Sequence, residues 1–177
     1  MSRRWPRSLR VLHWLTAGLL AVMVPAVLAA QALTETDTDR AEQLAGLHIL
    51  CGLAVFALTL PRLALRWLAV SPPPDSAPLL QRLASLRSIL FYVLLLVLPL
   101  TGVFKLTLSG LDVMAFGHTL IRAGSLAPGL ARALNSAHAW LAWSFLCLVA
   151  LHASAALWHA LRHRKESSAK LQTRTEA

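Results

Sequence analysis

The sequence is poor in charged residues and in cysteine. Only 14% of its 177 residues are charged, whereas 56% are hydrophobic and the mean hydropathy is +0.59. This composition excludes a disordered chain, which combines low hydrophobicity with high net charge. The two cysteines exclude a disulfide framework and a cysteine-rich metal site. Any metal chemistry must therefore use other side chains, and the seven histidines are the candidates.

Acidic residues are scarcer still, with 8 Asp and Glu against 17 Lys and Arg, which gives a net charge of +9. A continuous basic surface of this size would predict a nucleic-acid partner. The basic residues instead lie at the ends of long uncharged runs, so we expect no nucleic acid and a partner that is membrane lipid.

Four long uncharged runs dominate the chain, and each is close to the roughly 20 residues that a helix needs to cross the hydrocarbon core. They predict an all-α integral membrane four-helix bundle in one domain, residues 1–163. A basic tail, 164–177, is expected to be disordered. The predicted spans are 11–33, 43–61, 88–104 and 135–161.

The connecting segments carry their basic residues unevenly. The two termini and the middle connection hold 13 Lys and Arg, while the first and third connections hold 4. By the positive-inside rule, both termini are cytoplasmic and the first and third connections face outward. A cleaved signal peptide ending near Ala30-Gln31-Ala32 is the alternative for the first run. Its removal would destroy the agreement between the number of spans and the positive-inside rule.

Four histidines lie within or at the edge of the predicted spans, where an ionisable side chain is costly and marks a functional candidate. His138 and His152 are 14 residues apart, so they share one face of the fourth helix at depths about 21 Å apart. The predicted topology places His13 at the depth of His152, near the inner side. It places His48 at the depth of His138, near the outer side.

Two imidazoles that face each other from different helices are the ligands that a six-coordinate haem iron requires. The pairs His13/His152 and His48/His138 therefore predict two haems, and the lack of a Cys-x-x-Cys-His motif makes them non-covalent b-type haems. Interhelical hydrogen bonding and a proton relay are the competing interpretations of these histidines. Zinc fits less well, because it needs three or four ligands at one depth.

The same residues resemble the bacterial cytochrome b561 family of small dihaem membrane proteins, over about residues 8–163. The fourth helix carries the strongest similarity. By this resemblance His13, His48, His138 and His152 are the haem ligands, and Ser88 lies where the family usually has a third-helix His. The matching segments are 10–15 (RVLHWL), His48 with Gly52, 62–66, 99–102 (PLTG), 138–143 (HAWLAW) and 151–159.

The resemblance implies a multi-pass protein of the bacterial cytoplasmic membrane that passes electrons between the quinone pool and a donor or acceptor at the outer face. Ubiquinone or another quinone is the implied substrate, and superoxide oxidation coupled to quinone reduction is one implied reaction. The alternative is a haem-carrying membrane anchor subunit of a larger dehydrogenase or hydrogenase.

The third connection suggests how an anion would reach the outer haem. This connection holds three basic residues, Lys105, Arg122 and Arg132, and one acidic residue, Asp112. The excess of positive charge would steer a small anion inward. An ordinary solvated loop is the alternative. We expect Lys105 and Arg132 to lie closest to the outer haem.

Overall fold

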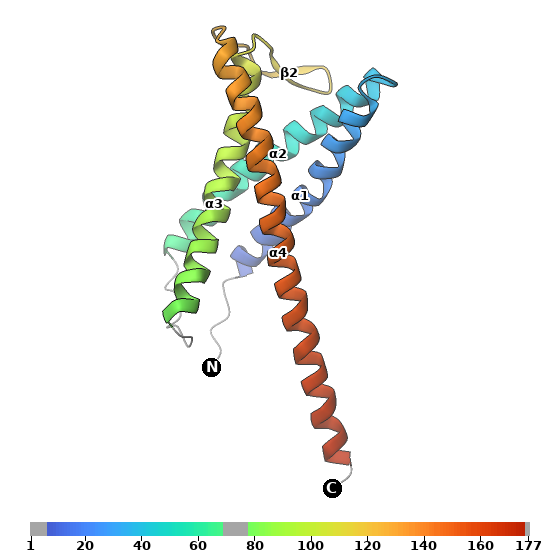
Figure 1. Ribbon diagram of the computed structural model, residues 1–177, viewed down its shortest axis with the longest axis vertical. Coiled ribbons are helices and arrows are strands. Elements are labelled where there is room, and N and C mark those ends of the chain that lie inside the picture. The colour runs from blue at the N-terminus through green and yellow to red at the C-terminus, as the bar shows by residue number, and fades with distance from the viewer. Residues whose placement is uncertain (1–6, 69–77, 176–177) are drawn as a thin grey trace. The chain divides into compact units, whose positions relative to one another are not determined.

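The computed structural model describes residues 7–68 and 78–175 of the chain. Within these ranges, four helices are long and apolar enough to cross a membrane. They are α1 (Arg7–Leu33), α2 (Thr38–Leu68), α3 (Pro78–Thr107) and α4 (Pro128–Thr175). A two-stranded hairpin, β1 (Val113–Ala115) and β2 (His118–Ile121), lies between α3 and α4. Figure 1 shows the order of these elements along the chain.

Helices α1 and α2 pack against each other along their lengths (Figure 1). Small side chains make this contact possible, because they let two helix backbones approach closely in a membrane. Asp37 starts α2 as its N-cap, since its Oδ1 accepts a hydrogen bond from the backbone N–H of Arg40 at 3.2 Å. The buried residues of the two helices are Leu9, Thr16, Ala26, Ala30, Ala41, Gly46, Cys51, Gly52, Val55 and Thr59.

The hairpin β1–β2 is an addition to the all-α fold that the sequence predicts. Ala115 pairs with His118, so only Phe116 and Gly117 form the turn. Both have positive φ, 50° and 78°, as a type I′ turn requires. Strand β1 contacts α2, and its Val113 and Ala115 are 1% and 4% exposed. The hairpin is therefore packed onto the helices rather than extended from them.

The chain divides into two compact units, Met1–Ala139 and Trp140–Ala177, and the boundary falls within α4. The first unit contains α1, α2, α3, the hairpin and the first turns of α4. The second contains the rest of α4. His13, His48 and His138 belong to the first unit, and His152 belongs to the second.

The helices run beyond the predicted spans at most of their ends. Helix α2 continues seven residues past 61 to Leu68, and α1 begins at Arg7. Charged residues ended the predicted spans, but a helix continues through the polar interface until its backbone meets a break. Helix α4 likewise continues to Thr175, over most of the segment 164–177 for which we expected disorder. Ala, Lys, Leu and Gln in that segment all favour a helix, and residues 176–177 lie outside the described part.

Candidate haem site

His48 of α2 and His138 of α4 face each other in the first unit. Their ring centroids are 6.5 Å apart, and the ring planes are inclined at 79°. Both side chains are half-buried. The structure thus brings together two histidines that lie 90 positions apart in the sequence. That they bind iron stays a prediction.

The Nδ1 atoms of both rings hydrogen-bond to backbone carbonyls. Nδ1 of His48 lies 3.1 Å from the Met23 carbonyl oxygen, and Nδ1 of His138 lies 3.1 Å from that of Leu98. A carbonyl oxygen only accepts, so each Nδ1 must carry the hydrogen. In a neutral imidazole the lone pair is then on Nε2, which is the atom available to a metal.

The separation of the two rings fits an iron between them. An imidazole nitrogen lies about 2 Å from a bound metal and the ring centroid roughly another 1.2 Å away, so two imidazoles that held one iron between them would have centroids about 6.4 Å apart. The observed 6.5 Å matches this value. The pair of rings, their tautomers and their spacing therefore fit a haem iron held by His48 and His138.

Two neighbouring residues of α3 position the His138 ring. The Thr101 hydroxyl donates to the Leu98 carbonyl at 2.8 Å, and its oxygen lies 3.0 Å from Nδ1 of His138. Nδ1–H of His138 is therefore shared between two acceptors. A Cβ atom on Gly102 would lie 3.3 Å from Cε1 of His138, which is a tight contact. Only glycine at 102 leaves this ring its full space.

The hairpin packs next to His48. A Cβ on Gly46 would lie 3.2 Å from both the Ala115 Cα and the Phe116 backbone nitrogen. Glycine at this position, two residues before His48, therefore allows β1 to approach α2 closely. Sequence reasoning missed this contact, because it did not predict the hairpin.

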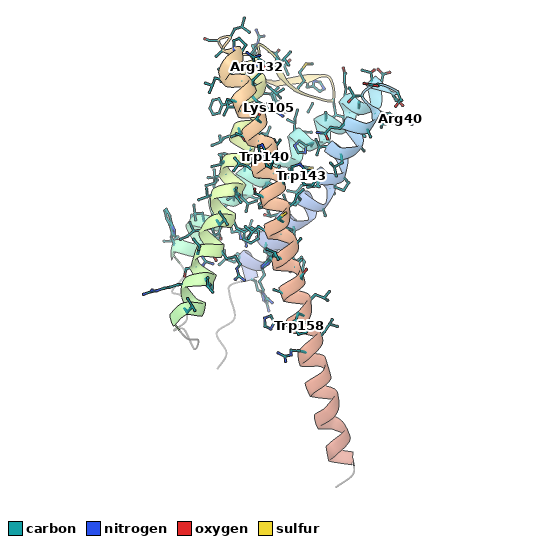
Figure 2. All side chains as sticks on the ribbon, in the orientation of Figure 1. Arg40, Lys105, Arg132, Trp140, Trp143 and Trp158 are labelled. Atoms are coloured by element: carbon teal, nitrogen blue, oxygen red, sulfur yellow. The ribbon has the colours of Figure 1, made fainter. Side chains whose placement is uncertain are left out.

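Lys105 and Asn135 join the end of α3 to the start of α4. Nζ of Lys105 donates to Oδ1 of Asn135 at 3.1 Å. Lys105 lies one turn beyond Thr101, and Asn135 lies three residues before His138. Figure 2 labels Lys105 and Arg132 at this end of the two helices. Asp112 is held within the third connection, where its Oδ1 accepts from the Ala123 backbone N–H at 2.7 Å.

His13 has a different environment from His48 and His138. Nη2 of Arg62 lies 3.3 Å from Nδ1 of His13. A guanidinium only donates hydrogen bonds, so Nδ1 of His13 is the acceptor and carries no hydrogen in this contact. Arg62 and Arg66 also lie over the ring of Tyr92. We call His13, Arg62, Arg66 and Tyr92 the Arg62 cluster.

His152 is half-buried and lies on α4 in the second unit. Its pairing with His13 stays a prediction. Ser88 lies where the resemblance led us to look for a third-helix His. Its hydroxyl donates a hydrogen bond to the Ala84 carbonyl at 3.0 Å. The hydroxyl of Ser88 is therefore hydrogen-bonded within α3 itself.

Comparison with known proteins gives the family. A family model described as prokaryotic cytochrome b561 matches residues 4–171, nearly the whole chain. The chain belongs to the prokaryotic cytochrome b561 family. Family membership implies b-type haem and electron transport, in a protein with several membrane spans.

The curated proteins that match the chain include the following two relatives. The protein named probable superoxide oxidase CybB from Yersinia pestis is 31% identical over 115 residues, which is 64% of this chain and 65% of that protein. The chain thus covers slightly less than two thirds of that relative. Cytochrome b561 homolog 2 of Escherichia coli (strain K12) is 30% identical over 161 residues, 83% of this chain and 79% of that protein.

Proposed function

We propose that this cytochrome b561 family member binds two non-covalent b-type haems and passes electrons across the bacterial cytoplasmic membrane. The electrons would move between the quinone pool and a donor or acceptor at the outer face. The observation that carries the proposal is the facing pair His48 and His138, 6.5 Å apart, with both Nδ1 atoms hydrogen-bonded to carbonyl acceptors.

The residues of this site would hold and orient an iron rather than react with substrate. A haem iron with two imidazole ligands changes oxidation state without an open coordination position, which suits it to electron transfer. The Met23 and Leu98 carbonyls fix the two imidazole tautomers, and Thr101 adds a second acceptor for His138. Such partners in the outer shell increase the basicity of a ligating imidazole and orient its ring.

The second haem is proposed at His13 and His152. His13 contacts Arg62, near the end of α2, whereas His48 contacts Met23, in the middle of α1. Since α1 and α2 pack along their lengths, His13 and His48 lie at different levels of this pair. Haems at two levels would give an electron two steps across the bilayer. Under the predicted topology, the His13 haem is the inner one and the His48/His138 haem is the outer one.

Superoxide is the outer-face donor that we propose. In the balanced reaction, two superoxide anions each lose one electron and become two O₂. One quinone takes up both electrons and two protons and becomes a quinol. The printed name of the Yersinia pestis relative supports this choice of donor. Lys105 and Arg132, near the His48/His138 site, supply positive charge that would attract an anion.

The test is to supply the purified protein with superoxide and a soluble ubiquinone. We expect quinol to form at the expense of superoxide, with half as many moles of quinol as of superoxide consumed. His48→Ala protein, lacking the outer haem, is the control and should form no quinol. A protein that holds two haems but forms no quinol, and that co-purifies with a large dehydrogenase or hydrogenase subunit, would instead be a membrane anchor.

A further inference from the structure

The connection between α3 and α4 is closed by hydrogen bonds between its two ends. The Thr107 carbonyl, at the last residue of α3, accepts from the Gly124 backbone N–H at 3.0 Å. The Leu108 carbonyl accepts from the Ala127 N–H at 3.0 Å, and α4 begins at the next residue, Pro128. These two bonds hold the C-terminal end of α3 next to the N-terminal end of α4.

Asp112 fastens the β1–β2 hairpin within this connection. Its Oδ1 accepts from the Ala123 N–H at 2.7 Å, and its Oδ2 accepts from the Thr119 hydroxyl at 3.4 Å. Asp112 directly precedes β1, Thr119 belongs to β2, and Ala123 follows β2. One carboxylate therefore links the start of the hairpin to its second strand and to the chain that leads into α4.

The first strand of the hairpin contacts α2. A Cβ atom on Gly46 would lie 3.2 Å from the Cα of Ala115 and from the backbone nitrogen of Phe116. Both are backbone atoms, so they cannot move aside as the end of a flexible side chain can. Val113, in the same strand, is 1% exposed, and β1 also contacts α3. The hairpin therefore meets α2 through its backbone, at a distance that Gly46 sets.

His48 lies two residues after Gly46 on α2. Two residues turn an α-helix by about 200° and advance it by about 3 Å, so the two residues lie at one level on different faces. Helix α2 therefore contacts the hairpin with one face and faces His138 with another. The His138 ring is in turn hydrogen-bonded to Leu98 of α3. The hairpin thus links the helix that carries one predicted ligand to the helices that hold the other.

We propose that the β1–β2 hairpin sets the position of His48 relative to His138, and that Gly46 and Asp112 are positioning residues for the haem between these ligands. This inference rests on the proposed function. Ligands must be held within about 0.5 Å and 10–20° of the required geometry by contacts other than the metal itself. Two helices with a flat cofactor between them cannot pack directly on each other at that level. A separate link, here the hairpin, must then hold them.

The competing interpretation is a hairpin that packs on α2 without affecting the ligands. The two interpretations differ in what happens at the haem when the contact is disturbed. In an oxidised haem with two imidazole ligands, the electron paramagnetic resonance g-values depend on the angle between the two rings. They change when His48 turns relative to His138. A loss of overall stability leaves the g-values of the folded fraction unchanged.

The first experiment enlarges Gly46 in purified full-length protein. Gly46→Ala places a Cβ 3.2 Å from two backbone atoms of the hairpin, and Gly46→Val adds two further methyl groups. We expect altered g-values or partial loss of the His48/His138 haem, larger for valine, with the His13 haem unchanged. Alanine favours a helix over glycine, so weaker helix formation cannot explain a loss in Gly46→Ala. Gly129→Ala is the control, since nothing lies within 4 Å of a Cβ there.

The second experiment separates the hydrogen bonds of Asp112 from its charge. Asp112→Ala and Asp112→Asn both remove the negative charge, but the asparagine side-chain oxygen can still accept from the Ala123 N–H. We expect Asp112→Ala to alter the g-values of the His48/His138 haem and Asp112→Asn to keep those of the wild type. Equal g-values in the two variants would overturn the positioning role of Asp112.

A readout without haem tests the link itself. Nitroxide labels on Gln43→Cys of α2 and Ala133→Cys of α4, both exposed positions, report the distance between the two helices by pulsed electron paramagnetic resonance. The sample is haem-free full-length protein in which Cys51→Ala and Cys147→Ala remove the native thiols. We expect a single distance distribution, which shifts or broadens in Gly46→Val because the hairpin can no longer approach α2 as closely.

Wild-type g-values, haem occupancy and label distances in both Gly46 variants would overturn the inference, as would an equal effect of Gly129→Ala. If Gly46→Val does not fold, Gly46→Ala and Asp112→Ala decide. Wild-type protein that binds no haem would refute the proposed function. The label distances in haem-free protein would still decide whether the hairpin holds α2.

Discussion

The His48–His138 site and the Arg62 cluster both contain a histidine that is predicted to ligate a haem, yet their hydrogen bonds are opposite. At the first site Nδ1 of each ring donates to a carbonyl, which leaves Nε2 for a metal. In the cluster Nδ1 of His13 accepts from Arg62. The partner of Nδ1 therefore indicates opposite tautomers: Nε2 of His48 and of His138 carries no hydrogen, whereas Nε2 of a neutral His13 carries it.

The two sites also differ in the charge of the groups that contact their histidines. The acceptors at the His48–His138 site are neutral carbonyl and hydroxyl groups, which suit the uncharged tautomer of a ligand. The cluster instead has two guanidinium groups, of which that of Arg62 contacts His13 and both contact the Tyr92 ring. The two sites therefore differ in the charge that lies next to the predicted ligands.

The largest expected effect comes from removing a ligand of the second site. His13→Ala or His152→Ala should each abolish one of two haem components, and both should abolish the same one, because the same iron loses a ligand in either variant. The measurement is haem content per chain with optical spectra at controlled potential. His118→Ala, an exposed change on β2, should keep both haems. If His13→Ala removed the component that His48→Ala removes, the pairing by depth would be wrong.

Gly102→Val should have a smaller effect, confined to the His48–His138 site. Even a single Cβ would lie 3.3 Å from the His138 ring, and valine adds two methyl groups. We expect partial loss of this haem, or altered electron paramagnetic resonance g-values that report a turned imidazole. Gly129→Val is the matched control in the first turn of α4, since nothing lies within 4 Å of a Cβ there. Normal g-values and full occupancy in Gly102→Val would refute the positioning role.

Reversing charge near the C-terminal end of α3 should change the rate of reduction and leave haem binding intact. Lys105→Glu with Arg132→Glu should slow reduction by superoxide about tenfold, because steering by local charge changes association rates by at least this factor. Stopped-flow spectroscopy at low salt measures the rate. Arg40→Glu, in the first turn of α2, is the control. An unchanged rate in the double variant would remove the steering proposal.

Thr101→Val should produce the smallest effect, a rise in the midpoint potential of the His48/His138 haem. The Thr101 oxygen is one of two acceptors for Nδ1–H of His138, and losing it makes the imidazole a weaker electron donor to iron. A hydrogen bond contributes about 0.5–1.5 kcal/mol, which bounds the shift at about 20–65 mV for one electron. Thr59→Val, whose hydroxyl bonds within α2, should leave this potential unchanged. A fall in potential would contradict the role given to Thr101.

The four helices could be predicted from the uncharged runs, because a span of hydrocarbon requires a fixed length of apolar helix. The ends could not, since α2 continues through Arg62 and Arg66 to Leu68. The hairpin was also missed. Its strands have three and four residues, and its turn is Phe116-Gly117, without the Asn-Gly or Asp-Gly pair that usually announces a type I′ turn.

The pair His48 and His138 could be chosen from topology, because depth along antiparallel helices follows from counting residues. Their Nδ1 partners could not. Every residue has a carbonyl, so nothing in the sequence marks those of Met23 and Leu98. The contact between Arg62 and His13 depends on the register between α1 and α2, which small residues set by close packing rather than by a recognisable motif.

The most direct test of the central claim is the haem content of His48→Ala and His138→Ala proteins beside the wild type. If one iron is held between these two imidazoles, the wild type contains two haems per chain, and each variant contains one. Both variants must also lose the same component in spectra resolved by redox potential. Loss of different components in the two variants, or a wild-type protein that binds no haem, would contradict the account.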